Sequence, residues 1–131
     1  MLFRSLFLRV EYDGEIATNG GTHAQARQDF AVLSGTRQSR ELMEAFLKTQ
    51  HAPEASFEVA LNAALDAWSI GHISLQAGNE NGQPERAAIL KHRQDQLATR
   101  GIEAALLERD SSRAIRYRSL SDTELCSLIH E

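Results

Sequence analysis

The side chains that could do chemistry on their own are few and scattered along this sequence. The chain has one cysteine, Cys126, and five histidines. No two of these residues stand at the spacing of a metal-ligand pair, so the sequence predicts surface histidines rather than a metal site. Because no histidine or lysine neighbours Cys126, and Leu125 and Ile129 flank it, we interpret it as a buried, unreactive thiol on the core-facing side of a helix. The histidines are His23, His51, His72, His92 and His130.

Two glycine-containing stretches and one serine-containing stretch have some of the residue types of a ligand site. The stretches "NGG" and "AGNENG" lack the glycine-rich patterns that cradle phosphates, so turns are favoured. The stretch "VLSGTRQS" holds Ser34 beside Gly35 but not the GxSxG elbow of a serine nucleophile. A helix start there could bind an anion, but a capped strand-to-helix turn is the favoured interpretation. The sequence therefore assigns no catalytic, cofactor-binding or metal-ligating residue, and it predicts no cofactor.

Length and composition are those of one globular domain over residues 1–131. No window approaches the roughly 18 apolar residues of a membrane span, and the apolar start has no signal-peptide cleavage site. The lone cysteine excludes a disulfide framework and favours a reducing, cytoplasmic setting. The net charge of −4 argues against nucleic acid as a partner. Twelve arginines against two lysines favour a subunit surface, because arginine binds carboxylates bidentately.

The first third of the chain predicts a β-hairpin with a long connection. Apolar side chains alternate with others over residues 6–12, which predicts a strand, and Asp13-Gly14 predicts a turn. Residues 15–28 are polar and contain two adjacent glycines, so we expect a loop. The short apolar run at residues 29–33 then predicts the second strand.

The middle of the chain predicts helices. Apolar residues repeat every four positions up to about Gln50, and Thr36 or Ser39 could cap that helix. Ser56 opens a second helix whose apolar stripe includes Trp68, so we expect this indole to be mostly buried against the sheet. Gly71 is the expected end of that helix.

A third, mostly polar helix is expected after the surface loop at residues 76–85. Pro84 suits its first turn, and Gly101 should end it. The stretch 72–100 therefore reads as an added loop and helix within the single domain.

The end of the chain predicts a second hairpin and a short helix. Residues 102–107 and 115–118 alternate in side-chain type around the turn "RDSS". Ser121 followed by Glu124 is a capping-box pattern, which predicts a helix that carries Leu125. The charged side chains of the hairpin favour an edge that is solvated or paired with a neighbouring subunit; they are Asp110, Arg113, Arg116 and Arg118.

The order β-β-α-α-(α)-β-β-α predicts an α+β fold with a four-stranded antiparallel sheet covered by helices. Both faces of the strand at residues 102–107 are apolar. A sheet that is apolar on both faces needs a second layer, and the chain does not obviously contain one.

Two stretches resemble bacterial α-type subunits of the proteasome core particle, which have the fold of the N-terminal-nucleophile hydrolase superfamily. The stretch "LFLRVEYDGEIATNGG…DFAVLSGT" resembles the family pattern "YRITYDG-x-I-A…FVVMGGT". The stretch "GIEAALLERDSSRAIRYRSLSDTEL" resembles the closing pattern "SLEVAVLDxxRPRRAFRRI…L". The similarity covers residues 4–129 but only the C-terminal half of a family member, and the two helices between the patterns lie where the family has its third and fourth.

Three features depart from the family pattern. The region from Gly71 to Gly101 is longer, Ser34-Gly35 stands where the family tends to have Gly-Gly, and residues 111–114 read "SSRA" where the family has "RPRR". The family's N-terminal half has no counterpart in the similarity. That half carries the other sheet, the gate segment, the first two helices and the lysine pocket for activator C-termini.

The resemblance implies the C-terminal part of a four-layer α-β-β-α sandwich and a non-catalytic role in intracellular protein degradation. In the family, α-type subunits form a ring that gates substrate entry, whereas β-type subunits cleave peptides with an N-terminal threonine. This chain begins Met1-Leu2, and an N-terminal nucleophile needs its own α-amino group as base, so we expect no hydrolysis by this chain alone.

The partners implied by the resemblance are other proteasome α and β subunits, a regulatory ATPase or activator indirectly, and further copies of this chain. No nucleic acid and no membrane are expected among them. Two alternatives stay open. One is a free-standing α+β binding module that self-associates, and the other is half of an N-terminal-nucleophile amidohydrolase.

Overall fold

The computed structural model describes residues 8–10, 13–14, 16–18, 30–50, 52, 54–78, 82–108, 110 and 112–129. The elements follow the order β1 (Leu8–Val10), β2 (Ile16–Thr18), α1 (Arg37–Gln50), α2 (Phe57–Gln76), α3 (Arg86–Arg100), β3 (Ala105–Leu107), β4 (Tyr117–Ser119) and α4 (Asp122–Leu128). This is the predicted order and confirms the α+β class.

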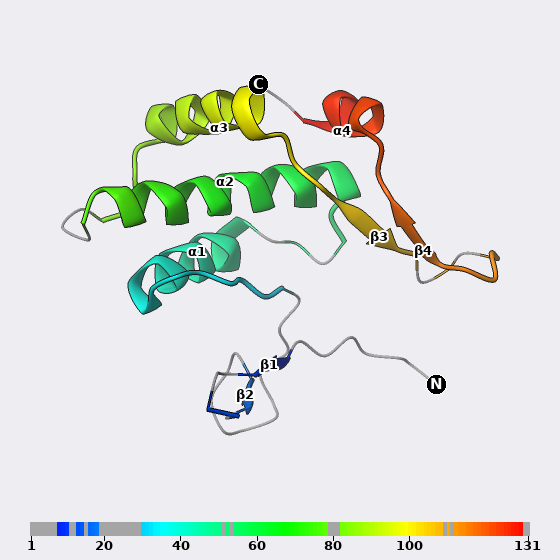
Figure 1. Ribbon diagram of the computed structural model, residues 1–131, viewed down its shortest axis with the longest axis horizontal. Helices are drawn as coiled ribbons and strands as arrows, with labels where there is room; N and C mark the ends of the chain where they lie inside the picture. The colour runs from blue at the N-terminus through cyan, green and yellow to red at the C-terminus, as the bar shows by residue number, and fades with distance from the viewer. Residues whose placement is uncertain are drawn as a thin grey trace.

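Three helices stack in layers with α2 in the middle. The chain runs back and forth through α1, α2 and α3, and α4 lies at the end of the stack where α2 begins (Figure 1). The core lies mainly between α1 and α2, with Ile89 added from α3. Its buried members are Val32, Met43, Phe46, Leu47, Ala67, Ile70 and Ile89.

Local capping signals set most helix ends as the sequence predicts. The side chains of Thr36 and Ser56 accept backbone N–H bonds from the third residue beyond, so each satisfies a donor at a helix start. Ser121 and Glu124 form the predicted capping box of α4. Gly101 ends α3 with a φ of 67°, a backbone conformation that favours glycine.

The second helix does not end at Gly71, contrary to the sequence-based prediction. It continues to Gln76, and Gly71 lies buried inside it against Ser39 and Met43 of α1. The Ser39 hydroxyl donates a hydrogen bond of 2.9 Å to the Gly71 carbonyl oxygen. Because glycine has no side chain, α1 and α2 can approach each other closely at this position. The first part of the stretch 72–100 is accordingly the last turn and a half of α2.

The strands form two separate two-stranded antiparallel sheets, not the predicted single sheet. In the first, Val10 pairs with Ile16 around the Asp13-Gly14 turn, so the second strand falls inside the stretch predicted as a loop. Residues 30–34 are not a strand, and Val32 packs in the helical core instead. A short turn costs less closure entropy than the long connection that was predicted, which favours the observed pairing.

The second sheet is the predicted C-terminal hairpin. Leu106 pairs with Arg118, and backbone hydrogen bonds extend the ladder from Ala104 to Glu108. Leu106 is half-buried, whereas Leu107 points to the opposite, exposed side. Figure 1 shows the hairpin projecting from the end of the helical stack. The sequence predicted a sheet covered by helices, but no described helix covers this hairpin.

Candidate functional site

A buried polar network joins α2 to α3. The carboxylate of Asp66 on α2 accepts a hydrogen bond of 3.0 Å from Nη1 of Arg93 on α3. Arg86, at the start of α3, pairs with the second oxygen of the same carboxylate. The side chains of Asp66 and Arg93 are only 8% and 4% exposed, whereas that of Arg86 is 60% exposed. The buried pair therefore depends on its own geometry for stability, because water cannot solvate either charge.

Asn62 extends this network to α4. Its side-chain oxygen accepts a hydrogen bond from Nη2 of Arg93. Its side-chain nitrogen donates bonds of 2.8 Å to the carbonyl oxygens of Glu58 and Leu128. Since Leu128 is the last residue of α4, one amide side chain links three helices.

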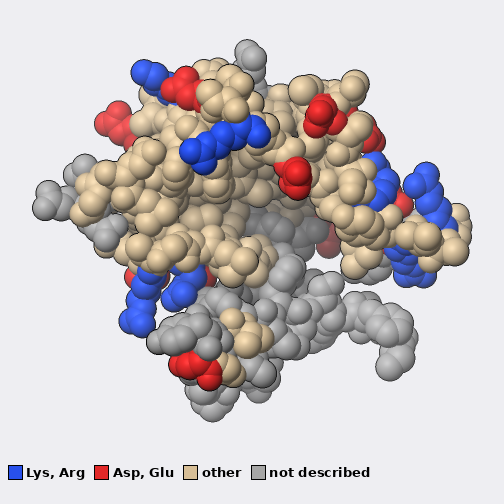
Figure 2. Space-filling view, viewed as in Figure 1, with Lys and Arg blue, Asp and Glu red and all other residues tan. Residues whose placement is uncertain are grey.

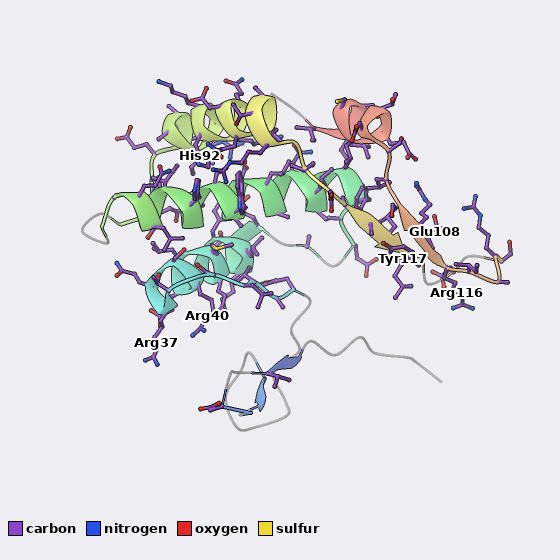
Figure 3. The ribbon with its side chains drawn as sticks, viewed as in Figure 1. Arg37, Arg40, His92, Glu108, Arg116 and Tyr117 are labelled. Atoms are coloured by element: carbon purple, nitrogen blue, oxygen red, sulfur yellow. The ribbon has the colours of Figure 1, made fainter. Side chains whose placement is uncertain are left out.

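A histidine pair with a tryptophan lies at the same α2–α3 interface. Nδ1 of His72 on α2 is 2.6 Å from Nε2 of His92 on α3. Trp68 stacks on His72 with 5.6 Å between ring centroids and an interplanar angle of 13°, and it also contacts His92 at 5.3 Å. Trp68 is 37% exposed and packs against the two histidines rather than against a sheet, so the predicted placement of the indole against the sheet is wrong. Figure 3 shows His92 between α3 and α2.

The pKa of His92 is lowered from its ordinary value. Burial is the main cause, because it disfavours the charged imidazolium, and the neighbouring His72 adds to the effect. Asp95 on α3 acts in the opposite direction and raises this pKa. The sequence does not predict this pair, because the two histidines are 20 residues apart on different helices and the pattern of each predicts a surface residue.

A mostly apolar cleft of about 440 Å³ lies between α3 and α4. Leu97 of α3 and Ile102, which follows that helix, line the cleft together with Leu125 and Cys126 of α4. Cys126 is exposed, so the prediction of a buried thiol is wrong. In α4 it is Leu125, the preceding residue, that is buried. One helical residue is a turn of about 100°, so Cys126 points away from that buried position.

The β3–β4 hairpin carries an apolar patch on its outer side, formed by Leu107, Ile115 and Tyr117. Their exposed fractions are 78%, 75% and 58%. Arginine side chains gather at the same end of the molecule (Figure 2), and Arg116 and Tyr117 both lie on this hairpin in Figure 3. Apolar side chains rimmed by charges are typical of an interaction surface.

An ion-pair cluster connects the hairpin to α4. Arg118 on β4 contacts Glu124 at 2.8 Å and Glu108 at 3.4 Å. Hydrogen bonds from the Ser121 backbone and hydroxyl, with Arg118 nearby, lower the pKa of Glu124 from 4.5 to about 2. The hydrogen bond that Arg118 donates to the Glu124 carboxylate likewise raises the pKa of Arg118. The sequence placed Arg118 on a charged edge, but its pairing with the capping box of α4 was not predicted.

The structure does not bring the other predicted features together into a site. Ser34 and Gly35 precede α1 at the surface of its capped start, and the residues of "NGG" lie outside the described part of the chain. His23, His51 and His130 also lie outside it. Among the residues that are described, no group of three or more His, Cys, Asp or Glu side chains could hold a metal ion. Nor does any described helix have the length and apolar character to cross a membrane.

Comparisons with known proteins place this chain in no family. The sequence matches no protein-family model, and no curated protein or solved structure is significantly similar to it.

Proposed function

We propose that this chain is a non-catalytic structural subunit of a proteasome-type self-compartmentalising protease and supplies the C-terminal half of an α-type fold. The proposal starts from the sequence resemblance described above. It is supported by the element order, in which hairpins flank the packed helices α1 and α2 and a short helix follows the last strand. In this interpretation α3, within residues 72–100, is an addition to the family pattern.

The observation that carries the proposal is the exposed patch of Leu107, Ile115 and Tyr117 on the β3–β4 hairpin. In an α-β-β-α sandwich, this side of the hairpin would pack against a second sheet. The patch has no cover among the described residues, as expected of a sheet layer whose partner layer is supplied from elsewhere. The proposal also requires the β1–β2 hairpin, which contacts no other described element, to join a sheet in the assembled particle.

The proposed role is ring assembly and gating of substrate entry in intracellular protein degradation. The partners would be α and β subunits of the particle, with an ATPase or activator bound indirectly. The Arg118 cluster would contribute by holding the hairpin at a defined angle to α4, because this one side chain contacts acids on both elements. A rigid hairpin presents its apolar patch to a partner with little loss of entropy.

The test is the solution mass of the chain, measured by light scattering on a sizing column. A seven-membered ring of this 14.6 kDa chain would have a mass of roughly 102 kDa. In a ring made of this chain alone, a neighbouring copy would have to cover the patch, so Leu107→Asp should reduce that mass to the monomer by putting a charge into this contact. Ser112→Asp is the matched control, since it adds the same charge to an exposed position on the same hairpin.

The other outcomes are equally informative. A dimer of about 29 kDa that Leu107→Asp dissociates would favour the alternative, a self-associating α+β module. A well-folded monomer that does not bind a hydrophobic dye would contradict both the ring subunit and the self-associating module, because the patch would then not behave as an interaction surface. Circular dichroism of both variants establishes that a change in mass is not a loss of folding.

A further inference from the structure

We propose that His72 and His92 form a pH-sensitive contact that holds α3 against α2 and loosens on acidification. This inference concerns the helical stack and does not depend on the proposed function. It starts from the contact of 2.6 Å between Nδ1 of His72 and Nε2 of His92, which is a hydrogen bond between two different helices.

The contact has a strict requirement for protons. One of the two facing nitrogens must carry a hydrogen and the other must offer a lone pair. Two neutral imidazoles meet this requirement, and so does a pair that shares one additional proton. When both rings are protonated, two N–H groups of like charge face each other and neither can accept. The hydrogen bond is then replaced by repulsion, so the doubly charged state is incompatible with the docked arrangement.

Packing around the rings strengthens this effect. Trp68 lies against both imidazoles, so the indole limits the access of water to the pair. Nδ1 of His92 is buried and has no hydrogen-bond partner among the described residues, so a proton added there would be poorly solvated. Burial therefore opposes charge on His92 from the side that faces away from His72.

The charged groups on the neighbouring elements do not cancel this effect. On α3, Asp95 favours the protonated form of His92, but burial and His72 outweigh it. On α2, Asp66 is already paired with Arg93 and Arg86 of α3. On α1, Arg40 is paired with Glu44, and α1 packs against α2 through the side that carries Gly71. On α4, Glu124 is paired with Arg118.

The direction of the pH dependence follows. An unfolded histidine has a pKa near 6.5, and the pKa of His92 is lower than this in the folded chain. The folded state therefore binds fewer protons than the unfolded state at pH values near and below 6.5. Stability falls as the pH drops through this range, and one excluded proton raises the unfolding equilibrium constant by up to about tenfold per pH unit.

The loosening is expected to be local. Ile89 in the core and the Asp66–Arg93 pair also hold α3 against α2, and neither contact involves a histidine. Acidification should therefore open the part of the interface around Trp68 and His92 before the whole fold is lost. A chain with this device would change the exposure of α3 between a neutral and an acidic compartment.

Trp68 supplies the measurement, since it is the only tryptophan of the chain and touches both histidines. The experiment follows Trp68 emission and urea unfolding of the full chain from pH 8 to pH 5, with a chelator present to exclude metal binding. Amide hydrogen exchange, corrected for intrinsic rates, is measured at pH 7.5 and pH 5.5. The matched variants are His92→Gln, which keeps a hydrogen-bonding side chain, and His23→Gln, which removes a histidine outside the pair.

We expect the wild type and His23→Gln to lose protection in α3, but not in α1, at the lower pH, with a change in Trp68 emission near the same midpoint. His92→Gln should lose most of this dependence. The proposal is overturned if His92→Gln keeps the wild-type pH profile, or if imidazole titration by NMR gives both histidines a pKa of 6.5 or higher. The NMR titration uses the wild-type chain, so it decides the matter even if the variant does not fold.

Discussion

Removing the carboxylate of Asp66 is the sharpest test of how the helical stack is held together. Asp66→Ala would remove the carboxylate that accepts a hydrogen bond from the guanidinium of Arg93. The Arg93 side chain is 4% exposed, so water cannot replace the lost partner. Asn62 would remain as a neutral acceptor for one of its nitrogens. The expected consequence is a buried guanidinium between α2 and α3 that has lost its ion pair with Asp66.

The size of the effect can be worked from burial. Breaking a buried ion pair by removing one partner costs about 3–5 kcal/mol. A domain of 131 residues is stable by roughly 7–20 kcal/mol in total, at the usual range per residue. Asp66→Ala should therefore remove a large fraction of the free energy of unfolding. Arg86→Ala should cost less than about 1 kcal/mol, because the Arg86 side chain is 60% exposed and its pair with Asp66 is solvated on one side.

The assay is urea unfolding at pH 7.5, followed by Trp68 fluorescence and by circular dichroism. With a slope of about 2 kcal/mol per molar urea, Asp66→Ala should lower the midpoint by roughly 1.5–2.5 M. The double variant Asp66→Leu with Arg93→Met should recover most of the loss, since an apolar pair needs no solvation. If Asp66→Ala is no more destabilising than Arg86→Ala, the buried network does not hold α2 and α3 together.

Two further predictions concern the helix crossing and the last helix. Gly71→Ala would place a Cβ in contact with Met43 and 3.0 Å from the Ser39 hydroxyl. It should therefore lower the free energy of unfolding by about 1–3 kcal/mol, and Met43→Ala should recover part of this loss. An unchanged urea midpoint would contradict this close approach of α1 and α2. Below pH 4.5 the contribution of Glu124 should decline as the pH falls toward its folded pKa of about 2, because the folded pKa lies below the ordinary one. Ser121→Ala should raise that pKa by removing the hydroxyl that bonds the carboxylate, whereas Ser127→Ala should not, and NMR titration of the Glu124 carboxyl measures both.

The sequence by itself determined the elements whose signals are local. The starts of α2 and α4 follow from Ser56 and Ser121, because an N-cap side chain bonds a backbone N–H only three residues away. The end of α3 follows from Gly101, and the β3–β4 hairpin follows from its two-residue alternation. Such signals act within one turn of helix or along one strand, so they can be recognised without knowing the rest of the fold.

Tertiary structure alone decided the features that join distant segments. The sequence predicted that α2 ends at Gly71, but the helix continues to Gln76. A glycine inside a helix lowers its stability by only about 1 kcal/mol, and the packing of α2 against its neighbours outweighs this cost. The first hairpin pairs β1 with β2 through a short turn, and Val32, which was predicted to lie in the second strand, packs in the helical core instead. The pairs Asp66–Arg93 and His72–His92 are 27 and 20 residues apart. No period or spacing marks either pair, because each exists only through the packing of α3 on α2.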